Sequence, residues 1–475
     1  MHSPRPPGKA LIVMLAVMCA APAGSADLPK LESISMDETE SHTRVVDDGA
    51  SASADDLFGL DETESSDNER PEKSGLEGFI QLESAYTYRS PTHLSKQRTI
   101  LELGTDGEIS DNMSWKLSGR ADYDAVFELN NFYSSRVRDN REFDAQIYEA
   151  YLDASAGNLD FRLGRQNIIW GEMVGLFVAD VVSAKDLRQF VAQDFDLIRI
   201  PQWAARAEYF KSDYHAEFIW LPVMTYNEIG KPGDDFYPLG TNLTQNPNVV
   251  IKKTEEPSNE LSNSAYGMRV STLKAGWDVS GFYYRSVDVE PSFFSEKVAA
   301  PDPTLIVTPE HKKIHQLGTT MAKDFGEVVL KGEAVFTKDR WFVTTDPSDV
   351  DGLTQQDILD YIVGLEHITP ENTLLNFQVF QRLYIDHEPD NLLDEFETGV
   401  SLFSKLEINS TVDAELLLIS QLNRTDWMAR PKVTWAFSTN WYLQLGADIF
   451  GGEEVSLFGR FEDSSRVYAN VRYTF

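Results

Sequence analysis

The chain contains 475 residues with a formal net charge of −34 at pH 7, and 42% of its residues are hydrophobic. This acidic excess argues against a nucleic-acid partner, because binding of phosphates needs clustered Lys and Arg. Cys19 is the single cysteine, which excludes a disulfide framework, a cysteine-based zinc site and an iron–sulfur cluster. Length alone would suggest about three ordinary domains, but the residue pattern indicates one large domain after two shorter segments.

The chain begins with the features of a secretory signal peptide, which we place at residues 1–26. A basic start precedes a twelve-residue apolar run and a group of small residues that ends at Ala26, after which we expect cleavage. The run is too short to span a membrane, so the peptide is expected to direct export across the inner membrane of a Gram-negative cell. Lipid attachment at Cys19 is disfavoured because the bulky Met18 precedes it.

Residues 27–74 form a separate acidic segment. They contain fifteen Asp and Glu against four Lys and Arg, a net charge of −11. Their scattered apolar residues cannot bury enough surface to offset the entropy cost of ordering, which predicts a disordered periplasmic tail. The alternative is that this tail docks on a periplasmic or inner-membrane transport partner, with short apolar islands such as 56–60 folding on contact.

The remaining residues, 75–475, show an alternation of apolar and polar residues that is typical of half-exposed β-strands. The alternation is clear at 115–127, where apolar residues stand at odd positions and mostly polar ones at even positions. The same pattern returns at 430–435, 441–449 and 466–475. We therefore expect an all-β structure.

Short and longer connections alternate between the candidate strands. The short connections are rich in turn-forming residues and lie at 110–112, 156–158, 211–213, 273–276, 324–326, 369–372, 405–407 and 438–440. The longer connections lie near 89–96, 129–143, 170–200, 223–263, 286–311, 338–357, 386–395, 421–426 and 451–465. Bacterial outer-membrane barrels have this asymmetry, with short periplasmic turns and long external loops. It predicts a transmembrane antiparallel β-barrel of about 18 strands, surrounded by outer-membrane lipid and lipopolysaccharide.

Two features of the aromatic residues fit this prediction. Trp and Tyr gather near the ends of candidate strands, as they do at membrane interfaces. The chain also ends in an alternating strand that finishes with Tyr473 and Phe475. This ending resembles the terminal strand of outer-membrane barrel proteins, which implies that the barrel-assembly machinery recognises Tyr473 and Phe475.

Residues 163–172, LGRQNIIWGE, and 180–187, DVVSAKDL, resemble a segment of porin-like bacterial outer-membrane β-barrels. These include alginate-export-like barrels and their functionally undefined relatives. The resemblance implies a barrel of about 18 strands, but it names no solute. Alginate exporters have a lumen rich in arginine, whereas the lumen-facing set predicted from the alternation here mixes Lys and Arg with many Asp and Glu. This difference argues against export of a polyanion.

The connection after the fifth strand is long but unusually apolar, which a solvated loop would not be. We expect it to fold into the lumen and to constrict the pore. Its charged residues are Glu172, Asp180, Lys185, Asp186, Arg188 and Asp194. The basic residues expected on the lumen wall are Arg120, Arg162, Arg206, Arg382, Arg430 and Lys432. Opposed charges would then sort solutes by charge and size. The alternative is that these charges form salt bridges that only pin the loop to the wall.

One short element is predicted inside this loop. Ser183, followed three residues later by Asp186, matches a helix-capping arrangement. The arrangement predicts a helix over residues 184–193.

These observations predict a channel for passive or facilitated passage of a small polar or amphipathic solute. Two alternatives stay open. One is an outer-membrane component of a coupled uptake or export system, for hydrophobic compounds or with an inner-membrane efflux pump. The other is a structural or adhesive surface barrel. A nucleophile elbow, a phosphate-binding glycine loop and a His-Glu-x-x-His zinc motif are all missing from the sequence. We therefore expect no enzyme, catalytic residue, metal or cofactor, while the solute, the direction of transport and the oligomeric state stay undecided.

Overall fold

The computed structural model describes residues 75–475 except 240, 245, 299–303, 347 and 371. These residues all belong to one compact unit. The predicted signal peptide, 1–26, and the predicted acidic tail, 27–74, lie outside the described residues. No helix in the described part of the chain is long and apolar enough to cross a membrane.

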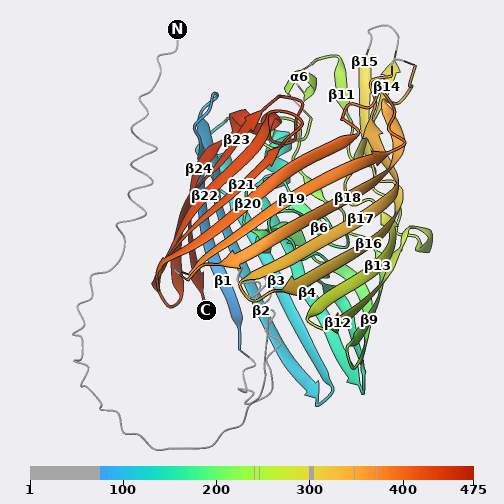
Figure 1. Cartoon of the computed structure of the whole chain (residues 1–475). Helices are drawn as coiled ribbons and strands as arrows, with labels where there is room; N and C mark the ends of the chain where they lie inside the picture. The colour runs from blue at the N-terminus through green and yellow to red at the C-terminus, as the bar shows by residue number, and fades with distance from the viewer. Residues whose placement is uncertain (1–74, 240, 245, 299–303, 347, 371) are drawn as a thin grey trace, which may run out of the picture. The chain divides into compact units, whose positions relative to one another are not determined.

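The described chain forms a closed antiparallel β-barrel of 18 strands (Figure 1). The first strand pairs with the last, so the sheet has no open edge. The prediction of an antiparallel barrel of about 18 strands is confirmed. The barrel strands are β1 (Glu77–Thr87), β2 (His93–Ser110), β3 (Met113–Asp124), β4 (Phe143–Ala156), β5 (Leu159–Gln166), β8 (Gln202–Lys211), β9 (Tyr214–Val223), β12 (Ala265–Lys274), β13 (Trp277–Val287), β16 (Lys313–Asp324), β17 (Val328–Val343), β18 (Leu353–Ile368), β19 (Thr373–Ile385), β20 (Phe396–Asn409), β21 (Val412–Gln421), β22 (Asp426–Ser438), β23 (Trp441–Gly452) and β24 (Arg466–Thr474).

The barrel strands are joined by short turns at one end and by longer connections at the other. The turn predicted at 405–407 is wrong, because β20 continues to Asn409 and the turn occupies 410–411. Leu406 and Ile408 continue the alternation and are 40% and 55% exposed. The charged residues between them therefore belong to a strand and not to a turn.

The connection predicted at 338–357 is also shorter than expected, because β17 runs to Val343 and β18 begins at Leu353. A β-bulge interrupts the pairing between Thr337 and Arg340. Such a bulge accommodates an extra residue within a continuing strand. Residues 338–343 and 353–357, which were expected to lie in a loop, are thus part of the barrel wall.

The longer connections carry short elements of their own. The strand predicted across 115–127 ends at Asp124, and its last residues enter a helix. These additional elements are α3 (Val126–Leu129), α4 (Ser135–Arg141), β6 (Ala184–Leu187), α5 (Phe195–Ile198), β7 (Arg199–Ile200), β10 (Glu228–Ile229), α6 (Thr241–Thr244), β11 (Val249–Ile251), η1 (Leu261–Asn263), β14 (Ser292–Val298), β15 (Thr304–Glu310) and η2 (Gly459–Ser464). Strands β11, β15 and β14 form a separate three-stranded sheet at the loop end of the barrel (Figure 1).

Side chains alternate between the two faces of the wall. On β3, Leu117 and Tyr123 are 47% and 42% exposed, whereas Arg120 and Asp122 are buried. Large apolar side chains are likewise exposed on other strands, and they include Ile147, Leu163, Phe218, Trp220, Met268, Leu317, Leu365, Phe377, Trp435 and Leu445. The outer face is thus apolar, and every barrel strand is hydrogen-bonded on both sides. A β-barrel needs both features to be stable in lipid.

The end of the chain closes the barrel. Gly78 and Phe475 exchange backbone hydrogen bonds, with N to O distances of 3.1 and 3.0 Å. The Tyr473 ring lies 4.8 Å from the Trp441 ring and 5.8 Å from the Phe475 ring, measured between centroids. The predicted role of Tyr473 and Phe475 as an assembly signal stays a prediction, and the structure places both at the seam between the first and last strands.

Candidate functional site

Residues 167–201, between β5 and β8, contact inward-facing side chains of many barrel strands, and we call them the lumen segment. Their polar contacts reach inward-facing side chains on strands from many parts of the wall. These wall residues are Arg120 on β3, Tyr148 on β4, Glu217 on β9, Glu333 on β17, Gln378 on β19, Arg430 and Lys432 on β22, and Arg466 and Arg472 on β24. The segment is thus bound to strands that lie far apart in the barrel.

The segment is first held by a buried tryptophan. Trp170 is 1% exposed, and its ring lies 5.0 Å from Phe282 and 5.8 Å from Tyr284. Its indole N–H donates to Glu217 Oε2 at 2.9 Å. A Cβ on Gly267 of β12 would lie 2.8 Å from this indole. Glycine at that wall position therefore lets the tryptophan pack closely against the strand.

A carboxylate on the wall then fixes the next turn of the segment. Glu333 Oε1 accepts the backbone N–H groups of Glu172 at 2.5 Å and Met173 at 3.1 Å, and Oε2 accepts that of Ala179 at 2.8 Å. Glu333 is 4% exposed. Three backbone donors from the segment converge on this one buried carboxyl group, so Glu333 is a principal anchor of the segment.

The helix predicted over 184–193 is wrong, since these residues contain the short strand β6 followed by turns. β6 pairs with β7 and with β10. Ser183 Oγ donates to the carbonyl of Ile168 at 2.8 Å, and Asp186 accepts the backbone N–H of Arg188 at 3.0 Å. Both side chains that suggested a capping arrangement are thus engaged elsewhere.

The last part of the segment faces the strands that close the barrel. Asp194 lies 3.7 Å from Lys432 Nζ, and Asp196 lies 3.2 Å from Arg472. Arg466, 1% exposed, donates to the carbonyl of Ala192 and to the side chain of Gln189, both at 2.6 Å. Four contacts with β22 and β24 thus join the segment to the end of the chain.

The other charged residues predicted on the loop mostly pair within it or at its edges. Glu172 lies 3.9 Å from Arg269 of β12. Asp180 binds Lys185 at 3.6 Å and Arg199 at 3.2 Å. The contacts of Asp180 stabilise the fold of the segment itself, whereas the Glu172–Arg269 pair joins the segment to the wall.

Asp186 and Arg188 form a second group at the middle of the segment. Arg188 binds Asp186 at 2.8 Å, Asp144 of β4 at 3.1 Å and Glu228 of β10 at 3.2 Å. Arg188 thereby connects the lumen segment to the wall and to the long external connection 224–264.

The basic residues predicted on the wall do lie on its inner face, and each has a carboxylate partner on the wall. The pairs are Arg120 with Glu102, Arg162 with Asp153, Arg206 with Glu208 and Glu217, Arg382 with Asp360, Arg430 with Asp448, and Lys432 with Glu415. Among the described residues, Asp194 with Lys432 is the one ion pair between the two predicted sets. Arg430 also lies beside the segment, where it donates to the carbonyl of Gln193 at 3.3 Å, while the facing of loop charges toward Arg162 and Arg206 stays a prediction.

Several anchoring residues were not singled out from the sequence. Glu333, Glu217 and Arg472 belong to the lumen-facing set that alternation predicts, but nothing local distinguishes them from other charges in that set. Arg466 and Asp196 likewise carry no motif. Their partners lie far away in the chain, for example 154 residues between Ala179 and Glu333, so that only the closed barrel brings them together.

Two carboxyl groups beside Arg188 titrate differently. Burial alone would raise the pKa of Asp186, but the Arg188 guanidinium outweighs burial and holds this pKa at about 2. Burial raises the pKa of Glu228 to about 7 despite Arg188, because the carboxylates of Asp186, Asp144 and Asp122 add repulsion. Glu228 therefore changes charge near neutral pH at the junction of the segment and the external connection.

The external connection 224–264 is itself tied down at the loop end of the barrel. Asp234 accepts from Arg141 of α4 at 2.7 Å, and Asp235 accepts from the Tyr133 hydroxyl at 2.7 Å. Burial raises the pKa of Asp234 to about 6 despite the neighbouring Arg141. These bonds hold the connection against the residues that follow β3.

The fold is a closed antiparallel β-barrel of 18 strands, with residues 167–201 bound to its inward-facing side chains. A family model described as "Protein of unknown function (DUF1302)" matches residues 92–475, and the chain belongs to that family. The family description assigns no activity, so the likeness to alginate-export-like barrels stays a prediction. No curated protein matches the chain.

Solved structures with the same kind of barrel are similar over most of the chain. OccAB2 of Acinetobacter baumannii is 12% identical with a TM-score of 0.49, covering 85% of this chain and 99% of that one. OccK8 (OprE) of Pseudomonas aeruginosa is 9% identical with a TM-score of 0.49, covering 84% and 97%. A mutant of the porin of Rh. blastica is 12% identical with a TM-score of 0.37, covering 84% and 99%. These likenesses concern the fold alone, so the function is argued from the lumen.

Proposed function

We propose that the protein is an outer-membrane channel for passive or facilitated passage of a small polar or amphipathic solute, with the lumen segment as its constriction. The observation that carries this proposal is the attachment of residues 167–201 to inward-facing side chains of strands β3, β4, β9, β17, β19, β22 and β24. An 18-stranded barrel leaves an aqueous passage unless something narrows it.

The charges along this passage support a solute of modest charge. Arg162 lies 2.8 Å from Asp153, and Arg382 lies 2.6 Å from Asp360. Opposite charges held this close partly cancel each other's field at the distance of a passing solute. The passage then offers alternating polar sites instead of a continuous positive track, which argues against a polyanion such as alginate.

Outer-membrane lipid, lipopolysaccharide and the barrel-assembly machinery are the partners we propose for the wall and for the C-terminal strand. The exposed apolar side chains of the outer face support the first two. The seam position of Tyr473 and Phe475 is compatible with the third.

The test is single-channel conductance of the full-length refolded protein in a planar bilayer under a salt gradient. We expect open steps of stable size and a measurable reversal potential. Folding is checked independently by heat-modifiable migration on a gel. A correctly folded barrel that stays silent would refute the passive channel and would favour a component that works with a periplasmic or inner-membrane partner.

A further inference from the structure

Three basic side chains form a row on the outer wall, at the end of the barrel that carries the long connections. Arg285 of β13 lies opposite His315 of β16, and His315 lies opposite Lys338 of β17. Neighbouring strands are about 4.8 Å apart, so the row spans about 10 Å. Tyr283 and Leu317, two residues further along the same faces, are 39% and 60% exposed. The row therefore faces outward, away from the lumen.

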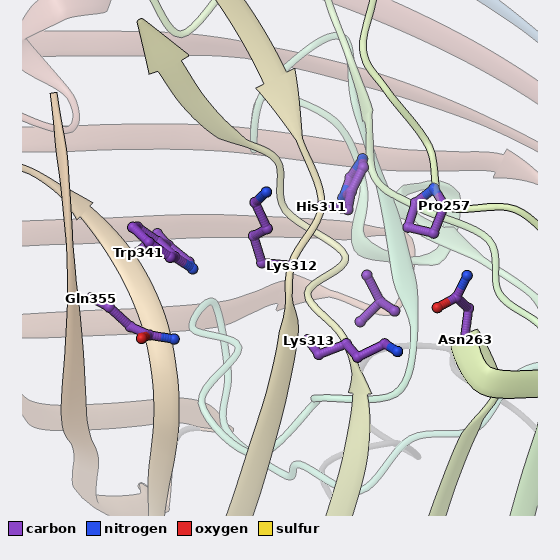
Figure 2. Close-up of a pocket in the computed structure, with 8 residues that line it drawn as sticks. Pro257, Asn263, His311, Lys312, Lys313, Trp341 and Gln355 are labelled. Carbon is purple, nitrogen blue, oxygen red and sulfur yellow. The ribbon is translucent and has the colours of Figure 1, made fainter. Parts of the chain in front are cut away.

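One more lysine, Lys313, continues this basic surface, whereas Lys312 beside it pairs with Glu310 at 2.6 Å. Lys313 lies on the same face of β16 as His315 and is exposed. Lys312 and Lys313 border a cavity of about 420 Å³, whose lining also includes Trp341 (Figure 2). Figure 2 shows Trp341 on one side of the lining residues, Pro257 and Asn263 on the other, and Lys313 between them. We call Arg285, Lys313, His315 and Lys338 the basic row.

The basic row lacks anionic partners among the described residues, in a protein whose acidic residues outnumber its basic ones by 76 to 42. In that part of the chain no carboxylate forms an ion pair with Arg285, Lys313 or Lys338. Arg285 instead donates to a backbone carbonyl at 3.4 Å. The carboxylate of Asp357, on the neighbouring strand β18, accepts the backbone N–H of Asp339 at 2.9 Å.

Arg285 and Lys338 stand on either side of His315, and Lys313 lies two residues from His315 on the same face of β16. The three cations Arg285, Lys313 and Lys338 repel one another across this part of the wall, and an anion bound on the outside of the wall would relieve that repulsion. Phosphate groups are anions that both Arg and Lys bind.

The aromatic residues around the row place it at the level of lipid headgroups. Arg285 lies 5.7 Å from the Tyr266 ring, and the Tyr283 hydroxyl binds His315 Nδ1 at 2.8 Å. Tyr and Trp mark the membrane interface, and cations just beyond such a belt bind acidic lipid headgroups. On the proposed function, this end of the barrel faces outward from the cell, where the outer leaflet is built of phosphorylated glycolipid.

We propose that the basic row binds the phosphate groups of lipopolysaccharide, the phosphorylated glycolipid of the outer leaflet. Lys313 and Lys338 supply mobile ammonium groups and Arg285 a fixed guanidinium. Trp341 and the cavity beside Lys313 accommodate part of the sugar headgroup or an acyl chain. The inference rests on the proposed function only for the orientation of the barrel in the outer membrane.

The test is binding of bisphosphorylated lipid A to the full-length protein in a zwitterionic detergent, followed by native mass spectrometry. We expect Lys313→Gln combined with Lys338→Gln to weaken binding by about tenfold or more. The matched control is Lys274→Gln, an exposed lysine at the opposite end of β12. The control should bind as the unmodified protein does, and monophosphorylated lipid A should bind more weakly than the bisphosphorylated form.

Equal affinity of the unmodified protein and the double variant would overturn the proposal. Binding lost equally in Lys274→Gln would also overturn it, since attraction would then be nonspecific. Inorganic phosphate is the second probe: competition by millimolar phosphate with no preference for the lipid would assign the row to a free anion. The single variant Lys338→Gln is measured if the double variant fails to fold. Because the row lies outside the lumen, conductance should be unchanged in every variant, so a silent channel and a missing lipid site are separate outcomes.

Discussion

The anchor at Glu333 offers the sharpest test of the lumen segment. Glu333→Ala removes the acceptor of the backbone N–H groups of Glu172, Met173 and Ala179. Each such bond contributes about 0.5–1.5 kcal/mol, and the variant also leaves three segment N–H groups without their acceptor. A net loss of about 3 kcal/mol would raise the population of the detached segment by roughly a hundredfold.

Hydrogen exchange measures this detachment directly. We expect the amides of Glu172, Met173 and Ala179 to exchange about a hundredfold faster in the variant, provided that exchange follows the opening equilibrium. Single-channel recordings should show larger or noisier open steps. The matched control is Glu366→Ala, which removes another buried inward-facing carboxylate whose partners, Lys331 and Asn376, belong to the wall. Unchanged exchange in Glu333→Ala, or equal acceleration in the control, would refute the assignment of Glu333 as an anchor.

Three further predictions concern charge, pH and the acidic tail. Arg206→Ala leaves Glu208 and Glu217 with less positive compensation, so the reversal potential should shift toward cation selectivity; an unchanged potential would mean that these pairs are only structural. The pKa of Glu228, about 7, lies above its ordinary value of 4.5, so the folded state binds the proton more tightly. The packing of β10 against the lumen segment is therefore most stable in acid. Its stability should fall as the pH rises from about 4.5 to about 7, measured by hydrogen exchange of β10, and Glu228→Gln should abolish that dependence. Deletion of 27–74 should leave conductance and solute uptake unchanged if the channel is passive, whereas loss of uptake in cells with normal conductance would indicate a coupled system.

The barrel could be predicted from the sequence because its determinants are local. Alternation of side chains has a period of two in every strand. The contrast between short turns and long connections shows which strand ends lie at the same end of the barrel. At 405–409, a short polar stretch resembles a turn, yet Leu406 and Ile408 continue the outward face. At 338–340, polar residues stand at a bulge within a continuing strand and therefore resemble a loop. Both errors arise because a few consecutive polar residues lie in a strand and not in a turn or loop.

The interior of the lumen could not be predicted in the same way. The lumen segment was distinguished by its apolar composition, but its conformation depends on partners that only the closed barrel provides. Ser183 and Asp186 satisfy a helix-capping pattern in sequence, and β6 forms instead because β7 and β10 supply its backbone hydrogen bonds. The carboxylate partners of the basic wall residues depend on strand register. Arg430, for example, binds Asp448 of the next strand and reaches the segment through the carbonyl of Gln193.

Contacts between the lumen segment and β24 also link closure of the barrel to formation of the constriction. Arg466 and Arg472 lie on β24, the last strand, and they hold the segment through Gln189, Ala192 and Asp196. The separation between Gln189 and Arg466 is 277 residues. These contacts need β24 in place beside β23, and β24 also pairs with β1 to close the sheet. Closure therefore brings two buried or half-buried cations to a segment that already carries their acceptors, and the constriction is completed by the strand that seals the barrel.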